Sequence, residues 1–279
     1  MQENVLHSVW KIEQEILDVI DAVCKAHDLR YSLMYGTLIG AVRHGGFIPW
    51  DDDIDIMMPR EDYNRLIEIW AEVAPEGYIL VNKNTNDDYT NNFTKIVKDH
   101  TTFLQDRGHC DKSFHKGIFV DIFPCDRIAP TTIGMKMQYF ACAIDLLYTR
   151  GYTSGSKGLI GLTEKVLLSL PKFWRPIIRE SAVHFYSKWN GHAVTPYMLP
   201  CTISSCKKKY PSTLFDDLET MEFNNKEYSV VSEADRVLRT EYGDYMKLPH
   251  VEERVWKHHP ILIDFYHNYE EIDNQNVSC

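Results

Sequence analysis

The chain has 279 residues, 44% of them apolar, which is enough to bury a substantial core in one large domain or two small ones. This composition excludes a disordered or fibrous protein. Acidic residues number 40 against 30 Lys and Arg residues, giving a formal net charge of −10. That balance argues against a general nucleic-acid binder, because such proteins gather positive charge to meet phosphates.

No part of the sequence is typical of a membrane span or a secretory signal. The stretch 189–206 lacks charged side chains but contains two prolines, an asparagine and a histidine, whereas a spanning helix needs about 20 mostly apolar residues. The seven cysteines are odd in number and scattered, unlike the paired set of a disulfide-stapled secreted domain. We therefore expect a reduced, cytoplasmic protein.

Helices and strands are predicted to alternate at the start of the chain. Apolar residues at spacings of three and four predict an amphipathic helix over residues 1–27. A short strand is predicted over 31–35, broken at Gly36, and a short helix over 37–42. The period of two that begins at Asp53 predicts a strand with two different faces.

The next predicted elements are a helix over 62–73 and strands over 78–82, 92–98 and 117–123, the last ended by Pro124. This alternation indicates an α+β or α/β core. From Pro130 the sequence favours long, mostly helical stretches over 132–150 and 159–190, interrupted by 151–158 and by Pro171 and Pro176. We therefore place a domain boundary there and expect residues 1–130 to form the core and residues 131–279 a mostly helical C-terminal region.

Asp53 and Asp55 carry the clearest chemical signal. Alternate side chains of a strand lie on one face about 6.5–7 Å apart, so these two carboxylates point the same way and repel each other unless a cation lies between them. Mg²⁺ suits such a pair, because it binds one or two carboxylates together with substrate phosphates. The alternative is a solvated acidic turn, against which the apolar neighbours argue. Asp51 is two residues before Asp53 and is therefore expected to point to the same side, whereas Asp52 is expected to face away or to brace the turn.

Two further features support a site here. Gly36 and Thr37 stand where a strand turns into a helix, and a helix N-terminus offers free N–H groups to an anion. Asp121 lies between Val120 and Ile122 in a run that is otherwise apolar, and a buried carboxylate without a partner is costly. The alternative for Asp121 is a pair with a buried Arg or a turn cap.

This order of motifs resembles the nucleotidyltransferase superfamily, with its polymerase-β-like fold, Gly-Ser/Thr turn, Asp-x-Asp strand and third acidic strand. Within it, residues 35–55, YGTLIGAVRHGGFIPWDDDID, resemble the signature of the LicD family, bacterial phosphocholine transferases related to the eukaryotic fukutin-type phosphosugar transferases. The likeness extends to GIFVDIFP at 117–124, YGDYM at 242–246, Leu248-Pro249, Arg254 and His258-His259.

The resemblance implies an α+β nucleotidyltransferase core whose C-terminal region completes a cleft for donor and acceptor. It also implies a phosphodiester-forming transferase that uses Mg²⁺, or Mn²⁺, to move phosphocholine from CDP-choline to a sugar hydroxyl of a lipopolysaccharide or teichoic-acid precursor, releasing CMP. The alternatives are transfer of ribitol or glycerol phosphate from the CDP conjugate, and an Asp-x-Asp glycosyltransferase that uses a nucleotide sugar. A non-catalytic nucleotide- or metal-sensing subunit would be expected to lose part of the acidic triad, which is complete here.

The resemblance also implies roles for individual residues. The catalytic residues are Asp53, Asp55 and Asp121, and the metal ligands are Asp51, Asp53, Asp55 and Asp121. Asp121 is either the third ligand or the base that takes the acceptor proton. The residues expected to bind the donor and its phosphates are Gly36, Thr37, Arg43, His44, Lys95, His258 and His259. Choline would lie on aromatic faces, for which the candidates are Tyr35, Trp50 and Tyr245.

A lipid-linked acceptor would place the enzyme at the inner face of the membrane. Residues 157–179 mix Leu, Ile, Phe and Trp with Lys and Arg, as helices at a membrane interface do. Core or groove-lining helices are the commoner explanation of such a pattern. No nucleic-acid partner is expected.

Overall fold

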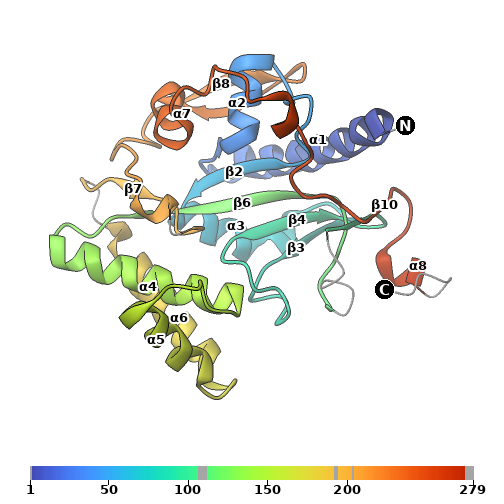
Figure 1. The fold of residues 1–279 in the computed structure, drawn as a ribbon. Helices are drawn as coiled ribbons and strands as arrows, with labels where there is room; N and C mark the ends of the chain where they lie inside the picture. The colour runs from blue at the N-terminus through green and yellow to red at the C-terminus, as the bar shows by residue number, and fades with distance from the viewer. Residues whose placement is uncertain (1, 106–111, 192–193, 203, 274–279) are drawn as a thin grey trace.

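The computed structural model describes residues 2–105, 112–191, 194–202 and 204–273. Its centre is a six-stranded mixed sheet in the order β1-β2-β6-β4-β3, and β7 pairs with the far end of β6 (Figure 1). Only the β2·β6 pair is parallel among these described strands. The six strands are β1 (Ser32–Leu33), β2 (Ile54–Pro59), β3 (Tyr78–Val81), β4 (Thr94–Lys98), β6 (Phe119–Arg127) and β7 (Tyr197–Met198).

Two small antiparallel sheets accompany the main one. β5 (Thr102–Leu104) pairs with β10 (Leu262–Asp264), and β8 (Leu218–Phe223) pairs with β9 (Lys226–Val231). The α-helices are α1 (Gln2–Ala26), α2 (Tyr35–His44), α3 (Arg60–Val73), α4 (Thr132–Arg150), α5 (Gly158–Ser169), α6 (Trp174–Ser187), α7 (Ala234–Tyr242) and α8 (Tyr269–Asp273). Short 3-10 helices span Lys188–Gly191, Ser205–Lys207 and Val251–Glu253. The fold is therefore mixed α+β, as predicted.

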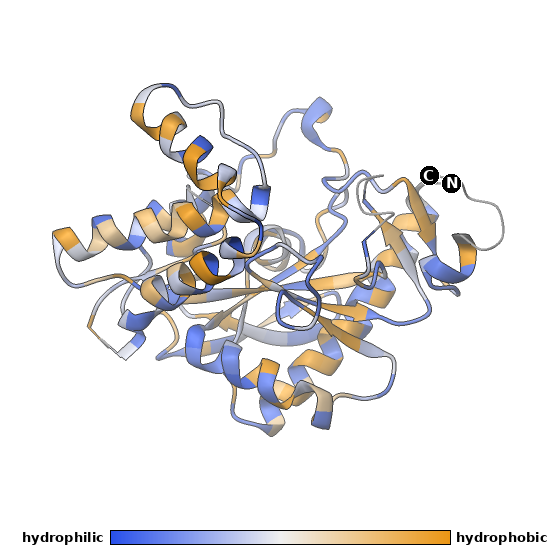
Figure 2. Cartoon of the chain, turned by 90° about the horizontal axis from the view of Figure 1, so that it is seen from below, coloured by the Kyte–Doolittle hydropathy of each residue, from blue (hydrophilic) through white to orange (hydrophobic). Residues whose placement is uncertain are grey.

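The elements surround the sheet in an order that positions its acidic strands. The helices α1 and α3 pack on the central strands, and the strands themselves are largely apolar (Figure 2). The helices α4, α5 and α6 gather on one side of the molecule, while α2, α7 and β8 lie together on the opposite side (Figure 1). One apolar core includes residues from both halves of the sequence, from Val9 in α1 to Leu238 in α7.

The predicted element bounds need several corrections. The first strand shrinks to Ser32–Leu33 because α2 begins at Tyr35, and Met34 between them still donates its N–H to the carbonyl of Asp55, opposite it in the β1·β2 register. The helical stretch expected over 159–190 is two α-helices and a 3-10 turn; its predicted break at Pro171 is confirmed, whereas Pro176 lies within the first turn of α6 and does not interrupt it. The C-terminal region holds four strands, β7 to β10, in addition to its helices.

Pro124 does not end its strand. It lies inside β6, opposite Met58 of β2. On the other edge of β6, β4 pairs only as far as Ile122 and β7 begins its pairing at Asp126. Pro124 falls between these two partner strands, where β6 has no partner among the described strands on that edge. The N–H that proline lacks is therefore not needed for a hydrogen bond there.

Candidate active site

The sheet register places three charged side chains in one row. Asp55 of β2 lies directly opposite Asp121 of β6, and Asp121 in turn lies opposite Lys95 of β4. Lys95 Nζ is 2.8 Å from Asp121 Oδ1 and 3.1 Å from the centre of the Phe119 ring. Asp121 Oδ1 is buried without a hydrogen-bond partner in the described residues, so the contact with Lys95 is an ion pair outside hydrogen-bond geometry. Two acidic strands that are far apart in sequence thus meet at one point.

The loop before β2 adds three more carboxylates. Asp51 and Asp52 are buried and Asp53 is half-buried. Both oxygens of Asp52 are occupied, since Asp52 Oδ1 accepts the backbone N–H of Lys257 at 3.0 Å and Oδ2 accepts that of His258 at 3.2 Å. Asp52 therefore holds the C-terminal segment against the acidic loop.

Gly36 and Thr37, in the first turn of α2, position the same carboxylates. The hydroxyl of Thr37 accepts the backbone N–H of Asp55 at 2.8 Å, which ties the helix to the acidic strand. A Cβ on Gly36 would lie 2.1 Å from Asp51 Oδ2, so only glycine leaves room for that carboxylate. No side chain caps the start of α2 among the described residues. Its first N–H groups therefore suit an anion.

These carboxylates open onto a cavity of about 650 Å³. Five acidic residues, three cationic residues and four aromatic residues share its wall, which combines the groups needed for a metal, a diphosphate and an organic cation. Those residues are Asp51, Asp53, Asp55, Asp244 and Glu253; Arg43, Lys247 and Lys257; and Tyr35, Trp50, Tyr242 and Tyr245.

Burial and mutual repulsion perturb the acids strongly. Burial, followed by the charges of Asp53 and Asp52, raises the pKa of Asp51 to about 8. Burial raises the pKa of Asp53 to about 6, although the nearby His258 opposes the shift. Burial and the charges of Asp53 and Asp121 raise the pKa of Asp55 well above its usual value. Such a set is costly to keep ionised without added positive charge.

The donor set fits a hard divalent cation. The cluster offers carboxylate oxygens, the ligands that Mg²⁺ prefers, and Asp121 Oδ1, although paired with Lys95 at 2.8 Å, accepts no hydrogen bond in the described chain. The ligand atoms of Asp52, Asp53 and His258 also lie within 4.8 Å of one another. His258 Nδ1 is 3.3 Å from Asp52 Oδ1, while Nε2 is 3.8 Å from Asp53 Oδ2. Because Asp52 already receives two N–H groups, Asp53 and its neighbours in the cavity are the better ligands.

Of the seven predicted phosphate-binding residues, Gly36 and Arg43 line this cavity, Lys95 lines a neighbouring pocket, and the others lie outside the cavity wall. Arg43 lines the cavity wall and donates to the carbonyl of Tyr245 at 2.6 Å, whereas His44 is exposed and accepts from Arg43 Nε. His258 packs against the acidic loop, as described above. His259 is exposed and lines a separate groove beside α1.

The three predicted choline-binding aromatics also differ in how they are held. Tyr245 is buried and its hydroxyl donates to Asp235 at 2.8 Å. The hydroxyl of Tyr35 is 3.1 Å from Cys201 Sγ. Trp50 is half-buried, with the Arg254 guanidinium 5.2 Å from its ring centre.

Several residues of the site have no strong local signal in the sequence. Glu13 of α1 is buried, its Oε2 has no hydrogen-bond partner in the described chain, and burial together with the charges of Asp53 and Asp52 raises its pKa well above the usual value. The one sequence feature that could have identified Glu13 is its position, as a charged residue, on the apolar stripe of the helix. Lys247 and Lys257 reach the cavity only through tertiary contacts.

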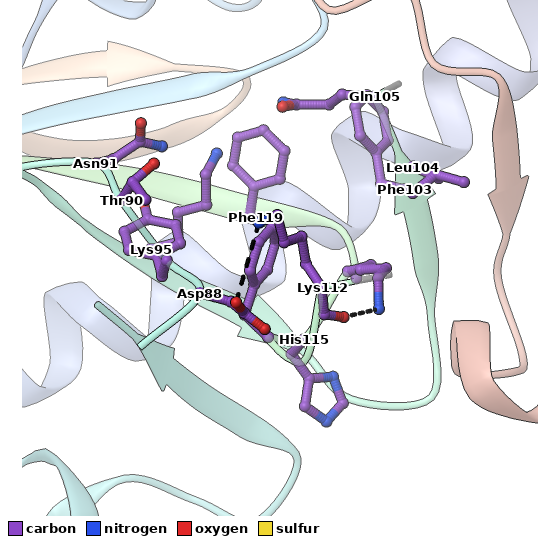
Figure 3. Close-up of a pocket in the computed structure, with 14 residues that line it drawn as sticks. Asp88, Thr90, Asn91, Lys95, Phe103, Leu104, Gln105, Lys112, His115 and Phe119 are labelled. Carbon is purple, nitrogen blue, oxygen red and sulfur yellow. Dashed lines mark hydrogen bonds and ion pairs between the residues drawn. The ribbon is translucent and has the colours of Figure 1, made fainter. Parts of the chain in front are cut away.

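A second, smaller pocket of about 110 Å³ lies next to the charged row (Figure 3). Lys95 lines it, and Figure 3 shows this side chain beside Phe119 and opposite Asp88 and Lys112. Its wall combines aromatic rings with amide and charged side chains. Through Lys95, this pocket adjoins Asp121.

A mixed sheet with carboxylates on adjacent parallel strands, beside a Gly-Thr helix start, defines a transferase domain of the nucleotidyltransferase class. Comparison with known proteins agrees: residues 28–140 match the LicD/FKTN/FKRP nucleotidyltransferase domain. The lipopolysaccharide cholinephosphotransferase LicD of Haemophilus influenzae is 30% identical over 276 residues, covering 91% of this chain and 96% of the relative. The ribitol 5-phosphate transferase FKRP of Homo sapiens is 43% identical over 49 residues, 18% of this chain and 10% of the relative.

The chain belongs to the LicD family and is a phosphotransferase. The predicted family, fold class and enzyme class are thereby confirmed. None of the helices in the described part of the chain is both long and apolar enough to cross a membrane.

Proposed function

We propose that this protein transfers phosphocholine from CDP-choline to a sugar hydroxyl of a cell-surface glycan precursor, in a Mg²⁺-dependent reaction that releases CMP. The observation that carries the proposal is the group of carboxylates, Asp51, Asp53 and Asp55, that shares one cavity with cationic and aromatic side chains. One relative, which covers 91% of this chain, is a lipopolysaccharide cholinephosphotransferase. A CDP-linked ribitol or glycerol phosphate donor is the alternative, which the short match to FKRP favours.

The donor would lie in the 650 Å³ cavity. Phosphoryl transfer depends on positioning and charge neutralisation, so the cationic side chains of Arg43, Lys247 and Lys257 would bind phosphate oxygens. Asp53 and Asp55 would hold the metal ion, which when bound neutralises the diphosphate. We propose Asp51 and Asp121 as further ligands.

The choline group would rest on an aromatic face. A quaternary ammonium has no hydrogen-bond donor, so its recognition relies on cation–π contacts of about 0.5–2 kcal/mol per ring. Of the three predicted rings, Tyr245 is buried, whereas Trp50 and Tyr35 are half-buried, and the Tyr35 ring already packs edge-on against Phe123 at 5.4 Å. We therefore propose Trp50 as the principal choline contact.

The acceptor sugar would enter from the second pocket (Figure 3). Aromatic rings and amide groups, as in Phe119, Asn91 and Gln105, suit a carbohydrate. Lys95 contacts Asp121 and also lines this pocket, so a hydroxyl bound there would be near Asp121. Asp121 would then act as the base for the acceptor proton, with its role as a metal ligand the alternative.

The C-terminal region would complete the cleft, because residues from 242 to 257 line the donor cavity together with residues from 35 to 55. The boundary near residue 130 stays a proposal, with residues 1–130 as the catalytic core and residues 131–279 as the region that completes the cleft. A cytoplasmic site is supported by the free thiols of Cys24, Cys125, Cys142, Cys201 and Cys206.

The donor is tested by thermal shift in Mg²⁺ with CDP-choline, CDP-ribitol, CDP-glycerol and nucleotide sugars. CDP-choline is expected to raise Tm most, and replacing Asp55 by Asn is expected to remove that shift. Asp216→Asn, at an exposed position outside the cavity, serves as the control and should keep the shift. Stabilisation by nucleotide sugars alone would favour the glycosyltransferase alternative and contradict the proposal.

A further inference from the structure

One surface of the protein is apolar without being covered by other described elements. α5 buries Gly161 and no other residue fully, while Leu159 is 79% exposed and Ile160 65% exposed. Leu159, Leu162 and Val166 follow each other at spacings of three and four, so they form one stripe along the helix. All three are exposed, which is unusual for a helix whose apolar face would ordinarily lie on a core.

The apolar stripe continues into the start of α6. Phe173 and Trp174 are exposed and their rings lie 5.7 Å apart, and Ile177, one helical turn on, is exposed as well. We call these residues of α5 and α6 the exposed apolar surface: Leu159, Ile160, Leu162, Val166, Phe173, Trp174 and Ile177. The helices concerned lie on the left of both Figure 1 and Figure 2, where orange turns reach the outside of the molecule.

The charge around this surface is opposite in sign to that of the whole chain. Six Lys and Arg residues and only two Glu residues lie between positions 157 and 188, within a chain of net charge −10. Lys157, Lys165 and Lys172 are exposed at the edges of the exposed apolar surface. A helix with an apolar face, a Trp and flanking lysines is the pattern of a segment that lies in a membrane interface and favours anionic lipids.

We propose that the exposed apolar surface of α5 and α6 docks on a bilayer that contains anionic phospholipid. The apolar side chains enter the boundary between headgroups and acyl chains, and the lysines contact the lipid phosphates. The local positive charge argues for a lipid surface over a second copy of this chain, since a second copy would bring the same lysines together. The proposal goes beyond the transfer reaction and is independent of which donor the enzyme uses.

Co-sedimentation with vesicles tests this directly. Vesicles with equal amounts of phosphatidylcholine and phosphatidylglycerol are expected to bind the protein, and pure phosphatidylcholine vesicles are expected to bind it about tenfold more weakly. Leu159→Ser combined with Ile160→Ser should lower binding to the mixed vesicles about tenfold or more. Both positions are exposed, so these changes should leave Tm unchanged. Lys165→Glu combined with Lys172→Glu should remove the preference for phosphatidylglycerol.

Two controls distinguish a specific surface from general stickiness. Tyr266→Ser removes an apolar side chain that is 78% exposed elsewhere on the molecule, and it should leave binding unchanged. Leu159→Ile with Ile160→Leu keeps the surface apolar and should bind as the unaltered protein does. Equal binding of the double-serine variant would overturn the proposal. So would a dimer in light scattering that this variant dissociates. Neither outcome depends on donor binding or turnover, so failure here is separable from failure of the proposed function.

Discussion

Replacing Asp51 by Asn should stabilise the metal-free protein. Asp51 is buried against Gly36, and burial with the charges of Asp53 and Asp52 raises its pKa to about 8. The amide has nearly the same shape as the carboxyl group but cannot ionise. The change therefore removes a buried negative charge from the acidic cluster without creating a cavity.

The sign and size of the effect follow from the pKa of Asp51. Folding raises the pKa of Asp51 from its usual 3.8 to about 8, so the folded protein keeps the Asp51 proton to a higher pH than the unfolded chain does. Stability from this group is therefore full below about pH 4 and falls as the pH rises to about 8. About four pKa units at about 1.4 kcal/mol each set an upper bound of about 6 kcal/mol. Because neighbouring acids share protons with Asp51, we expect about 2 kcal/mol at pH 8, or a Tm rise of about 4–8 °C.

Thermal unfolding in EDTA at about pH 5.5 and about pH 8 measures the effect, and the advantage of Asp51→Asn over the unaltered protein should be larger at the higher pH. Mg²⁺ should raise the Tm of the unaltered protein at the higher pH more than that of the variant. Asp216→Asn, an exposed control, should behave as the unaltered protein. A gain that is absent, or equal at both pH values, would refute the reasoning.

Three further changes test how the acidic residues are positioned. Gly36→Ala should lower turnover about tenfold or more while the fold persists, because the new methyl group would displace the Asp51 carboxylate; circular dichroism and CMP release measure the two effects. Thr37→Val should lower the free energy of unfolding by about 1–2 kcal/mol in urea, since it leaves the N–H of Asp55 without its acceptor; an unchanged urea midpoint would contradict this. Asp52→Ala should cost about 2–4 kcal/mol and expose the C-terminal segment to proteolysis, and resistance equal to that of the unaltered protein would argue against its bracing role.

The strands that carry Asp55 and Asp121 could be predicted from the sequence. The alternation that begins at Asp53 and the acid within an apolar run at Asp121 are local patterns of strands; the structure places Asp55 and Asp121 on strands and Asp53 in the loop just before β2. The parallel pairing of their strands brings Asp55 opposite Asp121, so two residues that local patterns single out lie together in the structure.

Contacts between distant parts of the chain could not be predicted from local sequence patterns. The N–H groups that Asp52 accepts come from residues more than 200 positions away, and the cavity cations Lys247 and Lys257 arrive the same way. The strand through Pro124 was misjudged because the sequence does not show where a partner strand ends. Glu13 was overlooked because the periodicity of a helix is read from its apolar residues, and a single charged residue on the same face does not change that pattern.

The most direct test of the central claim is CMP release from CDP-choline with a lipopolysaccharide acceptor, followed by mass spectrometry of the glycan. The account predicts that CMP and the choline phosphodiester appear together, only with acceptor and Mg²⁺, and that Asp53→Asn and Asp55→Asn each lower the rate about a hundredfold or more. Full activity in EDTA, or in either variant, would contradict it.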